Sequence, residues 1–430
     1  MMAKINQLIG SINDAKNTSV FKELYGNKAD IKAQEARYTK LLKAFSKRYP
    51  ELDEVEIFNT PGRTEVAGNH TDHNAGRVLA AAVGLDIIAV ASKNNSNIIT
   101  IQSEGYPEFS VNLNELTVKD NEKYTSSALV RGVSARLKEL GYVIGGFNAI
   151  MTGDVPKGSG LSSSAAFEVQ IVTILNYFYN NGKIDNIVNA QVSQYAENVF
   201  FGKPCGLMDQ TTCATGGFVT IDFKDFKKPI VEKVNFDFAS SGLTLAIIDT
   251  GGNHADLNED YAALENEMKE VAKFLGGTVL RDSSEEKLME KIGKIKGKVS
   301  DRAILRAMHF YADDNRVAED VKALKNNDVK QFLSLIIESG NSSWTLCQNC
   351  YSTKHVHEQG IPVALALSEK ILKNKGAWRV HGGGFAGTIQ AFVPDSVLVK
   401  YVSTMQSVFG KESVHQLFIR KTGSVKLKFL

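Results

Sequence analysis

The sequence lacks the residue patterns that mark several large classes of protein. Its four cysteines supply a single Cys-x-x-Cys, at Cys347 and Cys350, with no second pair of cysteines or histidines to complete a zinc site. We therefore expect reduced thiols at these positions. Lysine and arginine are scattered rather than clustered and the formal net charge is only +2, so no nucleic-acid-binding surface is predicted.

Long apolar runs are absent as well. The longest, residues 78–91, is interrupted by Asp86 and is too short to span a bilayer. Residues 1–20 contain no apolar core followed by a cleavage site of small residues, so secretion is not predicted. We expect a soluble cytoplasmic protein whose partners are small molecules, with no nucleic acid and no membrane, and the sequence leaves its oligomeric state open.

The chain does have an ordinary globular composition, 43% hydrophobic and 23% charged, and its 430 residues are enough for two domains with separate cores. Apolar periodicity predicts strands at 55–59, 78–92, 97–103, 108–113, 147–151, 218–223, 243–249 and 389–393, and helices at 33–49, 126–140, 165–178, 187–201, 261–275, 285–295, 301–326, 329–338 and 363–374. Because the composition shifts between residues 215 and 260, we predict domains 1–215 and 216–430. Periodicity alone indicates an α+β or α/β class.

A glycine-rich turn lies between a predicted strand and a predicted helix, at residues 153–164. The backbone amides of a first helical turn, together with the helix dipole, attract anions, and glycines let the backbone approach a phosphate closely. No Gly-Lys-Ser/Thr follows the glycines, so this is not a Walker loop. The turn predicts a nucleotide phosphate as ligand, with a plain tight connection as the alternative.

A second segment, residues 61–76, reads Pro-Gly-Arg-Thr-Glu-Val-Ala-Gly-Asn-His-Thr-Asp-His-Asn-Ala-Gly. So many hydrogen-bonding side chains beside glycines are costly to bury unless each finds a partner, and a polyhydroxylated ligand would supply those partners. The alternative is an Asx-rich surface turn. A third segment ends in Leu-Met-Asp-Gln at residues 207–210, where Asp209 alone is as consistent with a helix cap as with catalysis.

These segments resemble three motifs of one enzyme family. Residues 156–166, Pro-Lys-Gly-Ser-Gly-Leu-Ser-Ser-Ser-Ala-Ala, resemble the ATP loop of the GHMP small-molecule kinases, above all the galactokinases. Residues 62–76 resemble the galactokinase sugar signature, and residues 204–210 resemble the family's catalytic segment. The glycine run at 382–387 is similar to a further motif of the family, near its phosphate site, although a tight turn between a helix and a strand would read the same way.

The resemblance covers about residues 21–393 and implies both a fold and a function. The implied fold is a two-domain α+β GHMP kinase, with an N-terminal mixed sheet and helices, a C-terminal antiparallel sheet and helices, and the active site in the cleft between them. The implied activity is ATP-dependent phosphorylation of the anomeric hydroxyl of galactose, with ATP and Mg²⁺ as cofactors.

Matching the motifs residue by residue gives the expected site. The resemblance implies the catalytic residues Asp209 and Arg63; the sugar-binding residues Asn69, His70, Asp72 and Tyr261; the ATP-binding residues Gly158, Ser159, Gly160, Leu161, Ser162, Ser163, Ser164 and Ala165; and the Mg²⁺ ligands Ser163 or Ser164 with Glu197. Because Arg63 should lower the pKa of Asp209, the carboxylate suits alignment of the sugar hydroxyl as well as its deprotonation.

The sugar signature departs from the family pattern at three positions. Asn69 stands where the family has glutamate, Glu65 stands where it has asparagine, and His73 replaces a tyrosine. If the segment is extended, residues four apart face the same way, so the exchanged pair could keep a mutual hydrogen bond. The other interpretation is that losing the acidic acceptor at residue 69 changes which sugar hydroxyl is recognised.

Two alternative functions follow from these departures. One is a GHMP kinase for another sugar or amino sugar, such as N-acetylgalactosamine. The other is a catalytically silent sensor of sugar and ATP. Such sensors lose part of the Ser-Ser-Ser-Ala-Ala stretch, whereas residues 162–166 are complete here, and this favours an enzyme.

Overall fold

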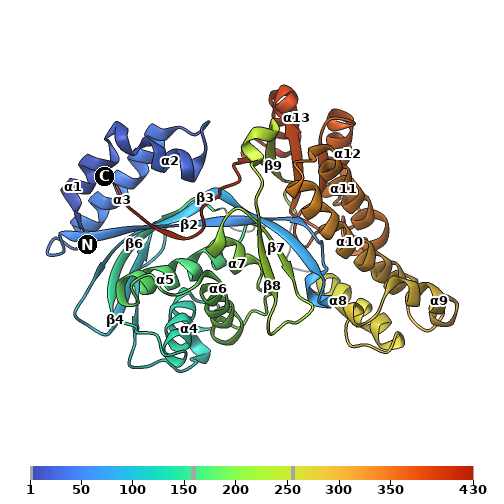
Figure 1. Ribbon diagram of the computed structural model, residues 1–430, viewed down its shortest axis with the longest axis horizontal. Helices are drawn as coiled ribbons and strands as arrows, with labels where there is room; N and C mark the ends of the chain where they lie inside the picture. Colours follow the sequence, from blue (N-terminus) through green and yellow to red (C-terminus); the bar gives the residue numbers. More distant parts are fainter. Residues whose placement is uncertain (1–2, 156–160, 253–256, 430) are drawn as a thin grey trace.

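The computed structural model describes residues 3–155, 161–252 and 257–429, and within them the strands form two sheets with helices packed around both (Figure 1). The larger sheet has nine strands, and its main path runs in the order β1-β2-β3-β6-β4-β5. Its strands are β1 (Ala3–Lys4), β2 (Glu54–Ala67), β3 (Arg77–Lys93), β4 (Ile98–Ser103), β5 (Phe109–Asn112), β6 (Phe147–Gly153), β7 (Phe218–Asp222), β8 (Ile230–Val234) and β13 (Val425–Leu427). Only β4 and β6 pair in parallel, which makes the sheet mixed, as expected.

Helices cover both faces of this sheet (Figure 1). On one face lie α1 (Ile5–Ile12), α2 (Thr18–Tyr25) and α3 (Ile31–Arg48), and on the other lie α4 (Ser126–Glu139), α5 (Ser163–Tyr179), α6 (Asn186–Tyr195) and α7 (Met208–Thr215). Alternate residues of a strand point to opposite faces. Accordingly Ile88 and Val90 of β3 pack with the first group of helices, while Ala89 and Ala91 pack with the second.

The smaller sheet is fully antiparallel, as expected, with the order β10-β11-β9-β12. Its strands are β9 (Leu243–Asp249), β10 (Ala377–Val380), β11 (Thr388–Pro394) and β12 (Val414–Leu417). Against it pack α10 (Asp301–Lys325), α11 (Val329–Ser342), α12 (Gly360–Leu372) and α13 (Leu398–Phe409), whereas α8 (Asn258–Phe274) and α9 (Glu285–Ile295) pack with the first half of α10 in a separate apolar cluster. The apolar run at 243–249 forms β9, which is an interior strand because β11 and β12 pair with it on either side.

The chain crosses between the sheets more than once. Strands β7 and β8 follow residue 216 yet belong to the larger sheet, and β13 returns to pair with β2 near the other end of the chain. The larger sheet therefore includes residues up to Val234, beyond the expected boundary at residue 215. That boundary stays a prediction. None of the helices in the described residues has the length and apolar character needed to span a bilayer.

Strand β2 carries the first half of the sugar segment into the space between the two sheets. Its pairing with β3 shifts register between Pro61 and Arg63, and such a bulge turns the following side chains to a new direction. The alternative of a surface turn is wrong, because residues 61–67 are strand and Asn69, Thr71 and Asn74 beyond them are buried. The bulge therefore aims Arg63 at the first turn of α7.

Candidate active site

Arg63 and Asp209 form a two-pronged ion pair where the two sheets meet. Arg63 Nε donates to Asp209 Oδ1 over 2.7 Å, and Arg63 Nη2 donates to Oδ2 over 2.5 Å. The Ser162 hydroxyl also donates to Asp209 Oδ2. The two residues predicted to be catalytic are thus in direct contact with each other and with the serine that precedes α5.

Asp209 does not act as a helix cap. It lies in the first turn of α7, whose N-cap residue is Leu207, and its carboxylate faces Arg63 rather than the backbone of its own helix. Burial raises the pKa of Asp209, but the charge of Arg63 and the hydrogen bonds from Arg63 and Ser162 outweigh it, so the pKa lies below its ordinary value. Asp209 is therefore a carboxylate at neutral pH.

The start of α5 has an unusual backbone. Ser162 adopts a φ of 57°, in the left-handed region that non-glycine residues rarely occupy and that is often found at functional sites. The preceding carbonyl, of Leu161, accepts a hydrogen bond from the backbone N–H of Arg63 over 3.2 Å. Gly62 makes this approach possible, because a Cβ there would lie 2.9 Å from the Leu161 oxygen. The predicted ATP-binding residues Gly158, Ser159 and Gly160 lie outside the described residues.

A group of hard oxygen atoms lies at the first turn of α5, two residues beyond Ser162. The Ser164 hydroxyl is 3.3 Å from Glu197 Oε1, and Gln210 Nε2 donates to Glu197 Oε2 over 2.9 Å and to Glu168 Oε2 over 3.2 Å. Glu197 belongs to a single π-helical turn, residues 196–201, that follows α6. Burial, with the nearby charge of Glu197, raises the pKa of Glu168 well above its ordinary value. The donor set suits a small hard cation.

Three of the predicted sugar-binding residues, Asn69, His70 and Tyr261, contact the glycine turn at 382–387. This turn joins β10 to β11, so the expectation of a turn between a helix and a strand is wrong, since β10 was too short to be recognised from its pattern. The carbonyl of Gly383 lies 2.9 Å from His70 Nε2, and that of Gly384 accepts from the Tyr261 hydroxyl over 2.9 Å. Burial lowers the pKa of His70 to about 3, so this imidazole is neutral.

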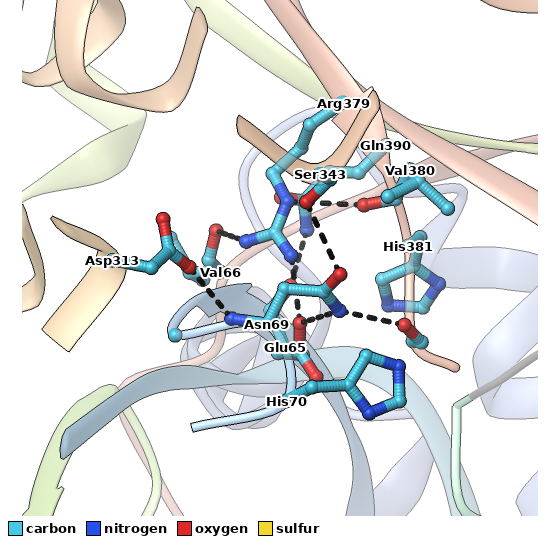
Figure 2. A network of polar contacts seen from close by, with 12 residues as sticks. Glu65, Val66, Asn69, His70, Asp313, Ser343, Arg379, Val380, His381 and Gln390 are labelled. Carbon is cyan, nitrogen blue, oxygen red and sulfur yellow. Dashed lines mark hydrogen bonds and ion pairs between the residues drawn. The ribbon is translucent and has the colours of Figure 1, made fainter. Parts of the chain in front are cut away.

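Asn69 and Glu65 make the mutual hydrogen bond that the exchanged pair predicts. Asn69 Nδ2 donates to Glu65 Oε1 over 3.1 Å and to the carbonyl of Gly382 over 2.8 Å (Figure 2). Asn69 Oδ1 accepts from Asn349 Nδ2 over 2.8 Å and from the Ser343 hydroxyl over 3.2 Å. Asn69 is fully buried, and these contacts occupy both ends of its amide.

Arg379, on β10, completes this network. Its guanidinium donates to Glu65 Oε1 and to the carbonyl of Val66, each over 2.8 Å, and to the carbonyl of Val380 over 3.0 Å (Figure 2). Burial raises the pKa of Glu65, and the charge of Arg379 opposes this rise. Arg379 therefore joins the smaller sheet to β2 through one carboxylate, that of Glu65, and one backbone carbonyl, that of Val66.

The other predicted residues surround this centre. Asp72 lies beside the chain leading to Asp209, since a Cβ added at Gly206 would be 3.1 Å from Asp72 Oδ2. Ser163 and Ser164 line a cavity of about 510 Å³, whose wall includes Tyr124 and Phe201. Leu161 and Ala165 are buried where the loop enters α5. Cys347 and Cys350 are free, buried thiols, and no group of three metal-ligating acidic, histidine or cysteine side chains occurs among the described residues.

Sequence reasoning did not identify several of these contacts. Gln210 follows the expected aspartate directly, and Arg379 lies three residues before the glycine run at 382–387, but the motifs assign a role to neither. The aromatic side chains of the cavity come from separate segments of the chain, so no local pattern could connect them with Ser163. Only their convergence in space marks them as part of one site.

Two family models match the chain. The description "GHMP kinases N terminal domain" fits residues 128–217, and "Galactokinase galactose-binding signature" fits residues 43–93. A galactokinase of Clostridium tetani is 27% identical over 380 residues, which cover 86% of this chain and 92% of that protein. A galactokinase of Glaesserella parasuis is 29% identical over 388 residues, which cover 88% and 94% respectively.

Solved structures agree with this relationship. The crystal structure of Lactococcus lactis galactokinase complexed with galactose is 25% identical, covers 90% of this chain and all of that one, and superposes with a TM-score of 0.75. The Methanococcus jannaschii mevalonate kinase shares the fold at 15% identity, with a TM-score of 0.60 over 85% of this chain and 98% of its own. The expected fold class is therefore confirmed.

Proposed function

Because the chain belongs to the GHMP kinases and, within them, to the galactokinase family, we propose that it transfers the γ-phosphate of ATP to the anomeric hydroxyl of galactose. The observation that supports this most directly is the Arg63–Asp209 pair. It lies between the start of α5, where the nucleotide is expected, and the sugar segment that begins on β2.

The proposed reaction needs no covalent bond between the protein and the transferred phosphate. The sugar hydroxyl oxygen forms a bond to the γ-phosphorus, the bond from that phosphorus to the β,γ-bridging oxygen breaks, and ADP leaves. Asp209 accepts the hydrogen bond of the attacking hydroxyl and aligns it, while Arg63 keeps the carboxylate ionised. The hydroxyl proton passes to Asp209 or to the product phosphate.

Ser164 and Glu197 fit a Mg²⁺ ion. Mg²⁺ prefers hard oxygen ligands and in such enzymes takes one or two from the protein and the rest from phosphates and water. The Ser164 hydroxyl and Glu197 Oε1 are 3.3 Å apart, and Gln210 holds the other carboxylate oxygen in place. When bound, the ion neutralises charge that develops on the transferred phosphate. Ser163, its neighbour on the cavity wall, is the alternative serine ligand.

Replacing Glu197 by glutamine should weaken the apparent affinity of the enzyme for magnesium. We expect the Mg²⁺ concentration for half-maximal activity to rise about tenfold or more, a loss that even outer contacts of a metal site produce. Titrating MgCl₂ at fixed ATP measures it. Glu168→Gln is the matched control, because Glu168 shares the contact with Gln210 but does not face Ser164. An equal rise in both variants would remove Glu197 from the metal site.

A coupled assay of ADP release across free hexoses, pentoses and N-acetylhexosamines tests the substrate. Turnover on galactose is the expected result. The Asn69 and Glu65 exchange favours one second candidate, a kinase for another sugar or an amino sugar such as N-acetylgalactosamine, and turnover on such a sugar alone would establish it. Binding of sugar and ATP without any ADP release would instead indicate a sensor and would reject the kinase.

A further inference from the structure

The buried polar network around residue 69 leaves one acidic oxygen without a partner. Glu65 Oε1 accepts from both Asn69 and Arg379, whereas Glu65 Oε2 accepts no hydrogen bond from the described residues. Figure 2 shows this second oxygen pointing away from Arg379, on the side of the network where His70 is drawn. The carboxylate is therefore only half used by the protein itself.

Exposure divides the exchanged pair in the same way. The Glu65 side chain keeps 12% of its surface exposed, whereas Asn69 keeps 0%. Asn69 has both ends of its amide occupied, so it has no free group to offer a ligand. Of the two residues, only Glu65 presents an unpaired polar atom.

Arg379 uses only one of the two carboxylate oxygens of Glu65. Arginine and carboxylate commonly pair through two parallel hydrogen bonds, which use both carboxylate oxygens. Arg379 instead donates one hydrogen bond to Glu65, from Nη2, and donates from Nη1 and Nε to the carbonyls of Val66 and Val380. This arrangement fixes one oxygen of Glu65 and leaves the other directed away from the ion pair.

The free oxygen of Glu65 lies on the side of the network where Figure 2 draws His70, one of the predicted sugar contacts. Asp72 and Arg63 both act electrostatically on the Glu65 carboxylate, and His70 lies on the side of its free oxygen. A carboxylate oxygen held rigidly in such a place is a strong acceptor for a hydroxyl donor. We propose that Glu65 Oε2 accepts a hydrogen bond from a ring hydroxyl of the bound sugar. The acidic residue that recognises the sugar then lies on strand β2 and not in the turn at residue 69.

This inference rests on the proposed function and refines it: Glu65 is a specificity-determining residue, and Asn69 and Arg379 are positioning residues that hold it. A site with a charged acceptor rejects an analogue lacking the matching hydroxyl far more strongly than a site that reads shape alone. The consequence is a measurable coupling between Glu65 and one hydroxyl of the sugar.

Galactose and its 2-, 3-, 4- and 6-deoxy analogues with the wild type and Glu65→Gln test this coupling. Glutamine keeps an acceptor for Asn69 and Arg379 but loses the charge. We expect Glu65→Gln to lower kcat/KM for galactose about 10- to 100-fold, mainly through KM, with KM for ATP unchanged. For one deoxy analogue the substitution should cause no further loss, because the interaction is already missing.

Glu56→Gln is the matched control. Glu56 lies on the same strand, its side chain is 10% exposed, and it pairs with Lys426 over 3.0 Å at the far end of β2. We expect it to leave all the sugar kinetics unchanged. A second pair of variants covers the case in which glutamine disturbs folding: Glu65→Asn should lose activity, and the exchange Glu65→Asn with Asn69→Glu should recover most of it by returning the carboxylate to the site.

The outcomes separate this inference from the proposed function. If galactose is phosphorylated and Glu65→Gln lowers kcat/KM by the same factor for every sugar, Glu65 is structural only and the inference is overturned while the function stands. If the wild type uses another sugar, the proposed substrate is wrong. The role of Glu65 is then tested separately, by comparing the wild type and Glu65→Gln on that sugar and on its deoxy analogues. If calorimetry and the assay detect neither binding nor turnover of any sugar, both proposals fall.

Discussion

Replacing Asp209 by asparagine should lower kcat about a thousandfold, within the range that a positioned catalytic carboxylate contributes. Asparagine keeps the shape of the side chain and can still contact Ser162, but it cannot hold the attacking hydroxyl with a negative charge, and it leaves Arg63 without its ionic partner. Nucleotide binding should survive, because the expected ATP contacts come from α5 and its loop. Single-turnover ADP formation and calorimetric titration with ATP measure the two effects.

Asp222→Asn is the control for the loss of an arginine–aspartate contact. Asp222 pairs with Arg281 over 2.9 Å and with Arg77 over 3.2 Å, and its side chain is 22% exposed against 28% for Asp209. We expect its kcat to match the wild type. Full activity of Asp209→Asn would contradict the proposed mechanism.

The lowered pKa of Asp209 also sets a direction for pH dependence. Because the native pKa lies below the ordinary value, the carboxylate stays ionised throughout the neutral range, and the stability it contributes is lost only as pH falls through that lowered pKa. The rate of the chemical step should therefore show no acid limb from Asp209 above about pH 4, the ordinary aspartate range. An acid limb nearer neutrality that disappears in Asp209→Asn would show that the carboxylate is a raised, proton-accepting base instead.

Replacing Arg379 by methionine should destabilise the fold by about 3–5 kcal/mol, the usual cost of removing one partner of a buried ion pair. The Arg379 side chain is 1% exposed, and its removal leaves the Glu65 carboxylate without its charged partner and the Val66 carbonyl without the Arg379 donor. Urea unfolding followed by fluorescence and by circular dichroism measures the loss. Agreement of the two probes establishes whether both sheets unfold together.

Two further variants serve as controls for this prediction. Arg379→Met combined with Glu65→Leu should recover part of the stability, since removing both partners leaves no uncompensated charge. Lys28→Met breaks the ion pair with Asp395, in which Lys28 is 81% exposed, and should leave the unfolding midpoint unchanged. If Arg379→Met were as stable as the wild type, the network would not be what joins β2 to the smaller sheet.

Much of the site could be predicted because its chemistry lies in short contiguous motifs. Glycine turns, the serines at the start of α5 and the Asp209 segment each occupy a few neighbouring residues, so their order along the chain was enough to indicate a sugar kinase. The exchange of Asn69 and Glu65 was equally visible, and the extended geometry of β2 followed by a tight turn brings the two side chains into contact.

The sequence by itself determined most of the strands and helices, the motifs and the residue types of the expected site, since these depend on local periodicity and on residues a few positions apart. The mixed and antiparallel character of the two sheets was implied by the family resemblance and not by periodicity. Only the tertiary structure decided which oxygen atoms are free. Arg379 lies 314 residues from Glu65, and Asn349 lies 280 residues from Asn69. The physical reason is that hydrogen-bond capacity inside a protein is shared among groups distant in sequence, so the atom left over for a ligand is known only once every other partner is in place.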